Sequence, residues 1–331
     1  MTLPNASSRT GRISAEHRGA YRILTSDNEL SAELEGKLRH RAQSRLDLPA
    51  VGDYVTYETL DATHAIVRGI LSRTSAIVRK AAGTRTEEQV IASNVDTLFI
   101  VAALDGDFNL RRLERYVILA WDGGVRPVIV LNKADLCEDP SFAEDAIAAT
   151  GWSVPIHRVC AFDGSVAATL APYLAAGQTV ALAGSSGVGK STLTNALLGE
   201  RRQDTGGVRT DDDKGRHTTT ARQLFALASG AALIDTPGMR ELQLWSDTAT
   251  VGGAFDDIAA AAQACRFADC AHDSEPECAV RDEIDPERLE SYRKLMREAA
   301  YLERRNDVSA QAAEKARWKA IHKAMRIASK G

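Results

Sequence analysis

The stretch that decides the fold reads Gly184-Ser185-Ser186-Gly187-Val188-Gly189-Lys190-Ser191, and Thr192 follows it. It fits the pattern G-x-x-x-x-G-K-[ST], whose glycines let the backbone curl until its N–H groups point at phosphate oxygens. In this pattern Lys190 reaches the β- and γ-phosphates of a nucleotide, and the Ser191 hydroxyl is a ligand of Mg²⁺. The stretch therefore predicts a phosphate-binding loop, and a glycine-rich turn without a ligand is the alternative.

The residues on either side of this loop supply the context that the pattern requires. The apolar run 179–183 predicts a buried strand before the loop. Leu193 and Leu197 share the buried side of a predicted helix after it, and such a helix directs the positive end of its dipole at a bound anion. This context favours a nucleotide-binding loop over a bare turn.

Strands and helices alternate over the central stretch, 93–247. Further strands are predicted from the apolar runs 97–103, 125–131, 154–161 and 231–234. Helices between them are predicted from a capping residue at Asn109, a capping-box pair at Ser141 and Glu144, and an apolar stripe at Val166, Leu170 and Leu174. The alternation implies an α/β domain with a largely parallel sheet, whose ligands bind beyond the carboxyl ends of the strands.

A second motif, Asn132-Lys133-Ala134-Asp135, ends one of these strands. The Asp135 carboxylate can accept two hydrogen bonds from the N1–H and N2–H₂ groups of guanine, whereas adenine presents the opposite polarity on that edge. Asn132 would brace the loop, and the stem of Lys133 could lie over the base. The motif predicts a preference for guanine; a polar turn after a strand is the alternative.

Two weaker signals also follow predicted strands. Asp235-Thr236-Pro237-Gly238 places Asp235 where it could hold Mg²⁺ through water and the Gly238 N–H where it could sense a γ-phosphate. Cys160-Ala161 stands where a backbone N–H could contact the guanine oxygen; a buried structural cysteine at Cys160 is the alternative.

The order of the motifs is unusual, because the guanine motif precedes the phosphate loop. Circular permutation explains this order simply, since chain termini often lie close together and joining them preserves the same packed sheet. The polar run 210–214 and Gly215 to Thr219 have the composition of a mobile loop. Thr218 or Thr219 would complete the coordination of Mg²⁺ only when a γ-phosphate is present, and the sequence does not choose between them.

Four potential metal ligands lie within residues 265–278: Cys265, Cys270, His272 and Cys278. Three thiolates and one imidazole make a closed tetrahedral Zn²⁺ site, which would be structural because no coordination position stays open. Reduced cysteines packed as small hydrophobic side chains are the alternative. After this cluster, Asp285 and Pro286 predict the start of a helix.

The first stretch, 1–92, differs from the rest in its short segments separated by glycine and proline, which predict a small β-barrel. A basic cluster, expected at the end of a strand, comprises Lys37, Arg39, His40, Arg41 and Arg45. It is either a solvated loop or a nucleic-acid contact. The tail after Glu314 is also basic.

Composition limits the class of protein. The chain has 331 residues, a formal net charge of -4, 44% hydrophobic and 26% charged residues, which excludes wholesale disorder and a uniformly basic protein. No apolar run approaches the roughly 18 residues of a membrane span, and the polar start lacks the features of a signal peptide. Five cysteines argue against a secreted disulfide scaffold, so a cytoplasmic protein without membrane contact is expected.

Together these motifs resemble the RsgA (YjeQ) family, circularly permuted GTPases that depend on the small ribosomal subunit. The resemblance rests on the motifs above and on 47–53, 78–83, 86–89, 94–96 and Glu275-Pro276-Glu277-Cys278-Ala279-Val280. It implies an OB-fold-like domain at 1–92, a permuted GTPase domain at 93–247, and a zinc-binding helical domain at 248–331.

The resemblance also implies an activity and a partner. The chain would hydrolyse GTP to GDP and phosphate with Mg²⁺, stimulated by the small (30S) ribosomal subunit, and would act late in the maturation of that subunit. The outer domains would contact ribosomal RNA, which gives the two basic clusters a role. We expect a monomer.

One departure from ordinary GTPases suggests how activity is controlled. Met239 stands where a glutamine usually orients the attacking water, and a thioether cannot replace that amide. We therefore expect slow hydrolysis in the isolated protein and faster hydrolysis on the ribosome. The resemblance places His217 on the mobile loop as the candidate for positioning water; a histidine that only packs there is the alternative.

Two other functions compete with this prediction. One is an RNA-binding module whose nucleotide site is vestigial, against which the intact Lys190, Ser191, Asp235 and Asp135 speak. The other is a permuted GTPase that acts on the large subunit or on cofactor insertion, against which the Cys–His cluster speaks. The prediction requires that Asp135 and Lys190 converge at one rim of a single sheet.

Overall fold

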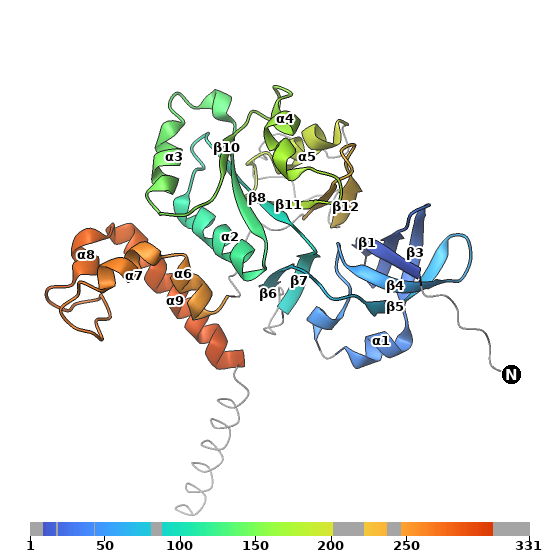
Figure 1. The fold of residues 1–331 in the computed structure, drawn as a ribbon, viewed down its shortest axis with the longest axis horizontal. Coiled ribbons are helices and arrows are strands. Elements are labelled where there is room, and N and C mark those ends of the chain that lie inside the picture. The colour runs from blue at the N-terminus through green and yellow to red at the C-terminus, as the bar shows by residue number, and fades with distance from the viewer. Residues whose placement is uncertain are drawn as a thin grey trace, which may run out of the picture. The chain divides into compact units, whose positions relative to one another are not determined.

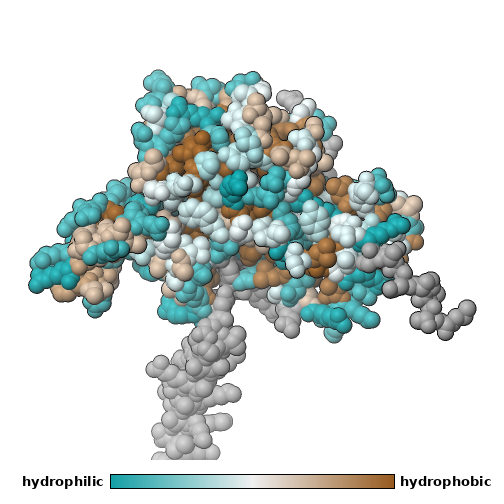
Figure 2. Space-filling view, in the orientation of Figure 1, coloured by the Kyte–Doolittle hydropathy of each residue, from teal (hydrophilic) through white to brown (hydrophobic). Residues whose placement is uncertain are grey.

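The structure, a computed structural model, describes residues 9–17, 19–42, 44–80, 88–200, 222–236 and 246–306. The chain divides into two units, Met1–Gln243 and Leu244–Gly331, which are described separately below. Among the described residues, no helix combines the length and the apolar character needed to cross a membrane. On the face shown in Figure 2, apolar side chains form small separate patches among hydrophilic ones.

A closed barrel occupies the start of the first unit. Its strands are β1 (Arg9–His17), β2 (Ala20–Leu24), β3 (Glu29–Leu34), β4 (Tyr54–Thr59) and β5 (His64–Ile70). They follow the order β1-β2-β3-β5-β4, and pairing of β1 with β4 closes the ring. This is the arrangement of a five-stranded OB-type barrel, so the predicted architecture of this region is confirmed.

The basic cluster of the barrel region does not lie at a strand end, as the sequence suggested. Strand β3 stops at Leu34, and helix α1 (Gly36–Arg41) carries Lys37, Arg39, His40 and Arg41, none of them buried. Arg45 belongs to the short helix η1 (Arg45–Asp47), whose N-cap is Ser44. These residues lack the alternating burial of a strand, and lysine and arginine are good helix formers, which explains the difference.

The central sheet has the order β10-β9-β8-β11-β13-β12. Its strands are β8 (Thr97–Ala103), β9 (Arg126–Asn132), β10 (Ile156–Arg158), β11 (Thr179–Ala183), β12 (Gln223–Ala226) and β13 (Ala232–Asp235). Every pairing is parallel except that of β12 with β13. The predicted parallel sheet is confirmed, although β10 is shorter than the apolar run 154–161.

Helices cover both faces of this sheet (Figure 1). On one face pack α2 (Leu110–Asp122) and α3 (Ser141–Ala148); on the other pack α4 (Val166–Leu170) and α5 (Lys190–Leu198). Along β8, Leu98, Ile100 and Ala102 face the first layer, and Phe99, Val101 and Ala103 face the second. Because both faces are buried, the whole of β8 is buried, as its continuous apolar run predicted.

The two predicted helix starts in this region have different outcomes. The Asn109 side chain accepts a hydrogen bond from the Arg112 N–H and caps α2, as predicted. The capping box at Ser141 and Glu144 does not form, because Ser141 is already the first residue of α3. Asp139 takes the capping role instead and accepts hydrogen bonds from the Ser141 N–H and hydroxyl at 3.0 and 2.6 Å.

Barrel and sheet are joined within the first unit. Strand β1 pairs with β12 at Ala15 and Gln223, so hydrogen bonding continues from the barrel into the central sheet. Arg12 of β1 donates to the Thr179 hydroxyl at 2.8 Å and to the Asn94 carbonyl at 3.2 Å. A separate two-stranded sheet, β6 (Ala76–Lys80) and β7 (Glu88–Ser93), leads from the barrel to β8.

The second unit is helical in its described part. It contains α6 (Thr248–Gly253), α7 (Asp256–Ala262), α8 (Ala279–Glu283) and α9 (Pro286–Asn306). The Asp285 carboxylate accepts hydrogen bonds from the Glu287 and Arg288 N–H groups, which confirms the predicted helix start. Arg288 then pairs with Asp257 of α7 and lies 4.6 Å from the Phe255 ring centroid, which holds the helices together.

Candidate active site and metal centre

The phosphate loop, residues 184–191, connects β11 to α5, as predicted. Gly184 and Gly189 have φ values of 145° and 97°, which favour glycine. A Cβ atom on Gly184 would lie 2.4 Å from the Val101 carbonyl oxygen, and one on Gly189 would lie 2.2 Å from the Asn132 Nδ2. Glycine is therefore required at both positions by conformation and by close packing.

Lys190 is the first residue of α5, and its side chain turns back over the loop. The Nζ atom donates hydrogen bonds to the carbonyl oxygens of Gly184 and Ser185 at 2.8 and 2.5 Å. Ser191 and Thr192 follow in the first turn of the helix. A positive charge and the N-terminus of a helix thus converge on the loop, which is the electrostatic requirement for binding phosphate.

The base-reading loop, residues 132–135, lies against the phosphate loop. The Asn132 Nδ2 donates a 2.8 Å hydrogen bond to the Val188 carbonyl oxygen, although the two residues are 56 positions apart in the chain. Asn132 is buried at 1% exposure, and its main-chain carbonyl oxygen accepts a hydrogen bond from the Leu104 N–H. The structure therefore brings the two predicted motifs together through a buried contact.

The other residues of the base-reading loop are less buried than Asn132. Lys133 has a φ of 60° and pairs through its ammonium with the Asp105 carboxylate. Asp135 is exposed on the short helix η2 (Ala134–Leu136). The Ala134 N–H donates to the Val159 carbonyl oxygen at 3.4 Å, which sets Cys160 and Ala161 beside this loop.

Asp235 ends β13, the neighbour of the strand that carries the phosphate loop. Ala181 of β11 pairs with Ile234, and the Asp235 side chain is 8% exposed. The Thr236 hydroxyl donates a 2.9 Å hydrogen bond to the Leu182 carbonyl oxygen, which fixes the chain beside the phosphate loop. Asp235 is thus positioned at the carboxyl edge of the sheet, where the sequence predicted it.

A polar cluster that the sequence analysis missed supports the phosphate loop. The Ser185 hydroxyl donates to the Asp107 carboxylate at 2.8 Å and accepts a hydrogen bond from the Arg112 guanidinium, which also contacts Asp107 at 2.8 Å. Partial burial would raise the pKa of Asp107, but the hydrogen bonds from Arg112 and Ser185 outweigh it, so the pKa is lowered. Asp107 follows β8, and its place beyond the carboxyl end of a parallel strand was the available signal.

Several predictions concern residues outside the part of the chain that the structure describes. These residues are His217, Thr218, Thr219, Gly238, Met239 and the basic tail after Glu314. Their predicted roles in water positioning, Mg²⁺ coordination and sensing of the γ-phosphate stay predictions.

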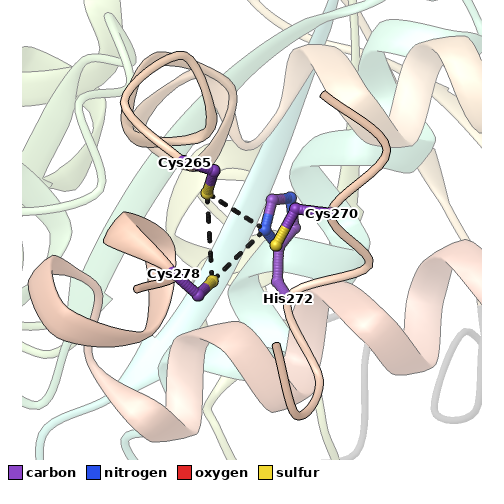
Figure 3. Close-up of side chains that lie close together, drawn as sticks. All are labelled: Cys265, Cys270, His272 and Cys278. Atoms are coloured by element: carbon purple, nitrogen blue, oxygen red, sulfur yellow. Dashed lines mark hydrogen bonds between the residues drawn. The ribbon is translucent and has the colours of Figure 1, made fainter. Parts of the chain in front are cut away.

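The four metal-ligand candidates of the second unit point toward one another (Figure 3). Their ligand atoms all lie within 4.8 Å of one another. Cys265 Sγ lies 3.9 Å from Cys278 Sγ and 3.6 Å from His272 Nδ1, and Cys278 Sγ lies 3.5 Å from that nitrogen. Tetrahedral Zn²⁺ with bonds of about 2.3 Å to sulfur needs sulfur atoms about 3.8 Å apart, so the cluster fits Zn²⁺.

Glu275, which was not predicted to matter here, organises the loop that bears these ligands. Its carboxylate accepts hydrogen bonds from the N–H groups of Ala271, Asp273 and Ser274 at 2.9, 2.8 and 3.1 Å. Hydrogen bonds from its own backbone N–H and from those of Ala271 and Asp273 lower the pKa of Glu275 to about 2. The thiols differ from each other: a backbone hydrogen bond at Val280 lowers the pKa of Cys265, whereas desolvation raises that of Cys270 to about 11.

A phosphate loop and a guanine-type motif, joined on one parallel sheet but reversed along the chain, define a circularly permuted P-loop GTPase. The sequence profile of the RsgA GTPase family matches residues 70–245. The chain belongs to the RsgA GTPase family and is a GTP hydrolase.

Several relatives carry the name small ribosomal subunit biogenesis GTPase RsgA. That of Opitutus terrae is 46% identical over 330 residues, covering 95% of this chain and 90% of the relative. That of Methanosarcina acetivorans is 44% identical over 315 residues, covering 93% and 84%.

Solved structures agree on the fold. YjeQ from Thermotoga maritima matches with a TM-score of 0.62 at 25% identity, covering 88% of this chain and 99% of that one. YloQ, described as a circularly permuted GTPase, matches with a TM-score of 0.59 at 23% identity, covering 91% and 98%.

Proposed function

We propose that the chain hydrolyses GTP at the joined phosphate and base-reading loops and acts in the biogenesis of the small ribosomal subunit. The contact between Asn132 and the Val188 carbonyl carries the first part, because it unites the two motifs that one guanine nucleotide must bridge. The relatives' names support the second part. A vestigial site is disfavoured, since the phosphate loop keeps its lysine, glycines and helix.

Each half of the site has a distinct task. The N–H groups of 184–191 and Lys190 would hold the β- and γ-phosphates, and Lys190 would stabilise charge that develops during phosphoryl transfer. Asp135 would accept hydrogen bonds from guanine, Lys133 would lie over the base, and the N–H groups of Cys160 and Ala161 would face the guanine oxygen. Asn132 and Ala134 position this loop by the contacts described above.

Oxygen donors suitable for Mg²⁺ lie on both sides of the phosphate loop. The Ser191 hydroxyl stands in the first turn of α5, and the Asp235 carboxylate stands at the end of the neighbouring β13. Hard oxygen ligands of this kind suit Mg²⁺, which would supply charge neutralisation on the phosphates. We propose that Ser191 and Asp235 hold it, with Thr218 or Thr219 added when the γ-phosphate is present.

The Cys–His cluster would hold one structural Zn²⁺. Three thiolates and one imidazole leave no open coordination position, so the metal would stabilise the second unit and take no part in hydrolysis. The sulfur–sulfur and sulfur–nitrogen distances reported above support this assignment.

The partner would be the 30S subunit with its ribosomal RNA. Helix α1 presents Lys37, Arg39, His40 and Arg41 without burying any of them, and exposed cations on one short helix suit a phosphate backbone. We also expect a cytoplasmic monomer, as the sequence predicts.

Turnover of GTP with and without purified small subunits tests this proposal. We expect slow turnover by the isolated protein, stimulation by small but not large subunits, and a loss of at least about 100-fold in Lys190→Ala. Lack of stimulation, or stimulation that survives in Lys190→Ala, would contradict it.

The role of His217 needs a separate arm of the same assay. If His217 positions the attacking water, His217→Ala should reduce subunit-stimulated turnover while leaving the affinity for GDP unchanged. Full stimulation of this variant would show that His217 has no such role.

A further inference from the structure

The first two residues of the phosphate loop, Gly184 and Ser185, carry the carbonyl oxygens that receive Lys190. The Lys190 Nζ donates to these two oxygens at 2.8 and 2.5 Å. The place of the ammonium therefore depends on the conformation of Gly184 and Ser185. Whatever holds these two residues also decides how well the charge of Lys190 is placed.

The segment after β8 and the start of α2 hold the Ser185 side chain. The Asp107 carboxylate accepts from the Ser185 hydroxyl at 2.8 Å. The Arg112 Nη1 donates both to the Ser185 Oγ and to the Asp107 carboxylate, the latter at 2.8 Å. The Asn109 side chain accepts from the Arg112 N–H at 3.0 Å and caps α2, which fixes the main chain from which this guanidinium extends.

One turn further along α2, Tyr116 contacts Gly184. Burial raises the pKa of Tyr116 to about 12, although the charge of Arg112 and a hydrogen bond with the main chain of Gly184 act in the opposite direction. Residues one turn apart lie on the same side of a helix, so Arg112 and Tyr116 reach the phosphate loop together. Helix α2 therefore contacts both residues that receive Lys190.

Stability of the fold alone is a weak reason for the pair of Arg112 and Asp107. Their side chains are 33% and 43% exposed, and ion pairs at such exposure add little to the free energy of unfolding. Their shared contact lies on the phosphate loop, at Ser185, 73 and 78 positions away along the chain. The pair is better explained by a task in that loop.

We propose that α2 and the segment before it supply positioning residues that act on the nucleotide through Lys190. These residues are Asp107, Arg112 and Tyr116. They hold the start of the phosphate loop in the conformation that places the ammonium against the phosphates, so that its charge needs no reorganisation when the nucleotide binds. The proposal rests on the proposed function, because it needs Lys190 at the phosphates.

A double-mutant cycle on the affinity for GDP tests the proposal. In the wild-type background, Arg112→Ala and Tyr116→Phe should each raise the dissociation constant of GDP by about 3- to 30-fold, because the ammonium is less well placed. In the Lys190→Ala background, the same substitutions should change that constant by less than about twofold, because the group on which they act is absent. A purely structural role would give the same factor in both backgrounds.

Two substitutions in the barrel are matched controls. Tyr21→Phe removes the hydroxyl of a tyrosine that is buried to the same 3% exposure as Tyr116. Arg22→Ala removes an arginine from an exposed ion pair with Glu29. Both variants should bind GDP as the wild type does. Arg112→Ala removes a partly exposed side chain, so its result decides the question if Tyr116→Phe lowers the melting temperature.

The outcomes separate this inference from the proposed function. Wild-type affinity for GDP in Arg112→Ala, or the same loss with and without Lys190, would overturn the positioning role and leave the nucleotide site intact. Failure of the wild type to bind GDP, or undiminished binding by Lys190→Ala, would overturn both.

Discussion

The central sheet of the first unit and the Cys–His loop, residues 265–278, hold their functional residues in opposite ways. Strand β8 is buried along its whole length between two helical layers. Within the Cys–His loop only Cys278 is buried, and every residue from 266 to 277 is at least partly exposed. The sheet can position ligand-binding loops by apolar packing, whereas the Cys–His loop has to rely on its ligands and on hydrogen bonds.

This difference teaches where each region is vulnerable. Apolar burial spreads stabilisation over many side chains, so the loss of one leaves the sheet weakened but folded. A metal site concentrates the stabilisation in one ion, because the segment that supplies the ligands folds only as it binds the metal. The free energy of metal binding therefore stabilises the folded segment directly. Three perturbations, taken from the largest expected effect to the smallest, sharpen the comparison.

Removal of the metal should have the largest effect. A structural Zn²⁺ contributes on the order of 10 kcal/mol, and few buried side chains in the Cys–His loop replace it. In the full chain, we expect a chelator to abolish amide protection in 265–278 and the affinity for GDP to stay unchanged. Added Zn²⁺ should restore protection, and Cys265→Ser should reproduce the loss.

The result that would contradict this expectation is protection that persists after the metal has been removed and verified as absent by elemental analysis. The four residues would then be cysteines and a histidine packed without an ion.

Truncation of a sheet residue should have a smaller effect. Leu98 is fully buried in β8, so Leu98→Ala is expected to cost about 2 to 5 kcal/mol through lost burial and a cavity. Loss of GDP binding during denaturant titration measures unfolding of the first unit. The denaturant concentration at the unfolding midpoint should fall, while amide protection of the Cys–His loop should stay at the wild-type level.

If Leu98→Ala reduced both the unfolding midpoint of the first unit and the amide protection of the Cys–His loop, the two regions would not be stabilised separately. The exposed Leu60→Ala is a suitable control, because it removes a side chain of the same size without opening a cavity.

Loss of the Glu275 charge should have the smallest effect. Glu275→Gln weakens three hydrogen bonds to the backbone around Cys270 and His272, so the affinity for Zn²⁺ should fall by about 10- to 100-fold. Competition with a chromogenic chelator measures it. Glu277→Gln is the matched control, since the Glu277 side chain is 67% exposed and its carboxylate pairs with Arg266 at the surface. Equal affinities of the two variants would show that Glu275 does not organise the site.

Contiguous motifs could be predicted from the sequence, since their function resides in local backbone geometry. The phosphate loop, the base-reading loop and the four metal-ligand candidates are of this kind. Their joining could only be inferred from strand order, and the contact that achieves it, Asn132 to Val188, links residues distant in the chain. Asp107 was not predicted for the same reason, since its partner Ser185 lies 78 residues away along the chain.

The parts that escaped prediction have local physical reasons. Strand β1 could not be located by alternation, because its register with β2 shifts between Ile13 and Ala15 and this bulge breaks the alternating pattern of a strand. Helix α1 was taken for a strand end because it buries no residue and so has no apolar stripe. Glu275 stands in a motif on which the resemblance rests, but its role was not predicted, because its partners are backbone N–H groups, which any sequence would supply.

Strand β11 has a mechanical consequence. Its first residue, Thr179, accepts the hydrogen bond from Arg12 of the barrel, and the phosphate loop begins immediately after its last residue, Ala183. Strand β11 is paired on both sides, with β8 and with β13, so the backbone of its five residues is restrained. A displacement of Arg12 in the barrel would therefore be transmitted along β11 to residues 184–191.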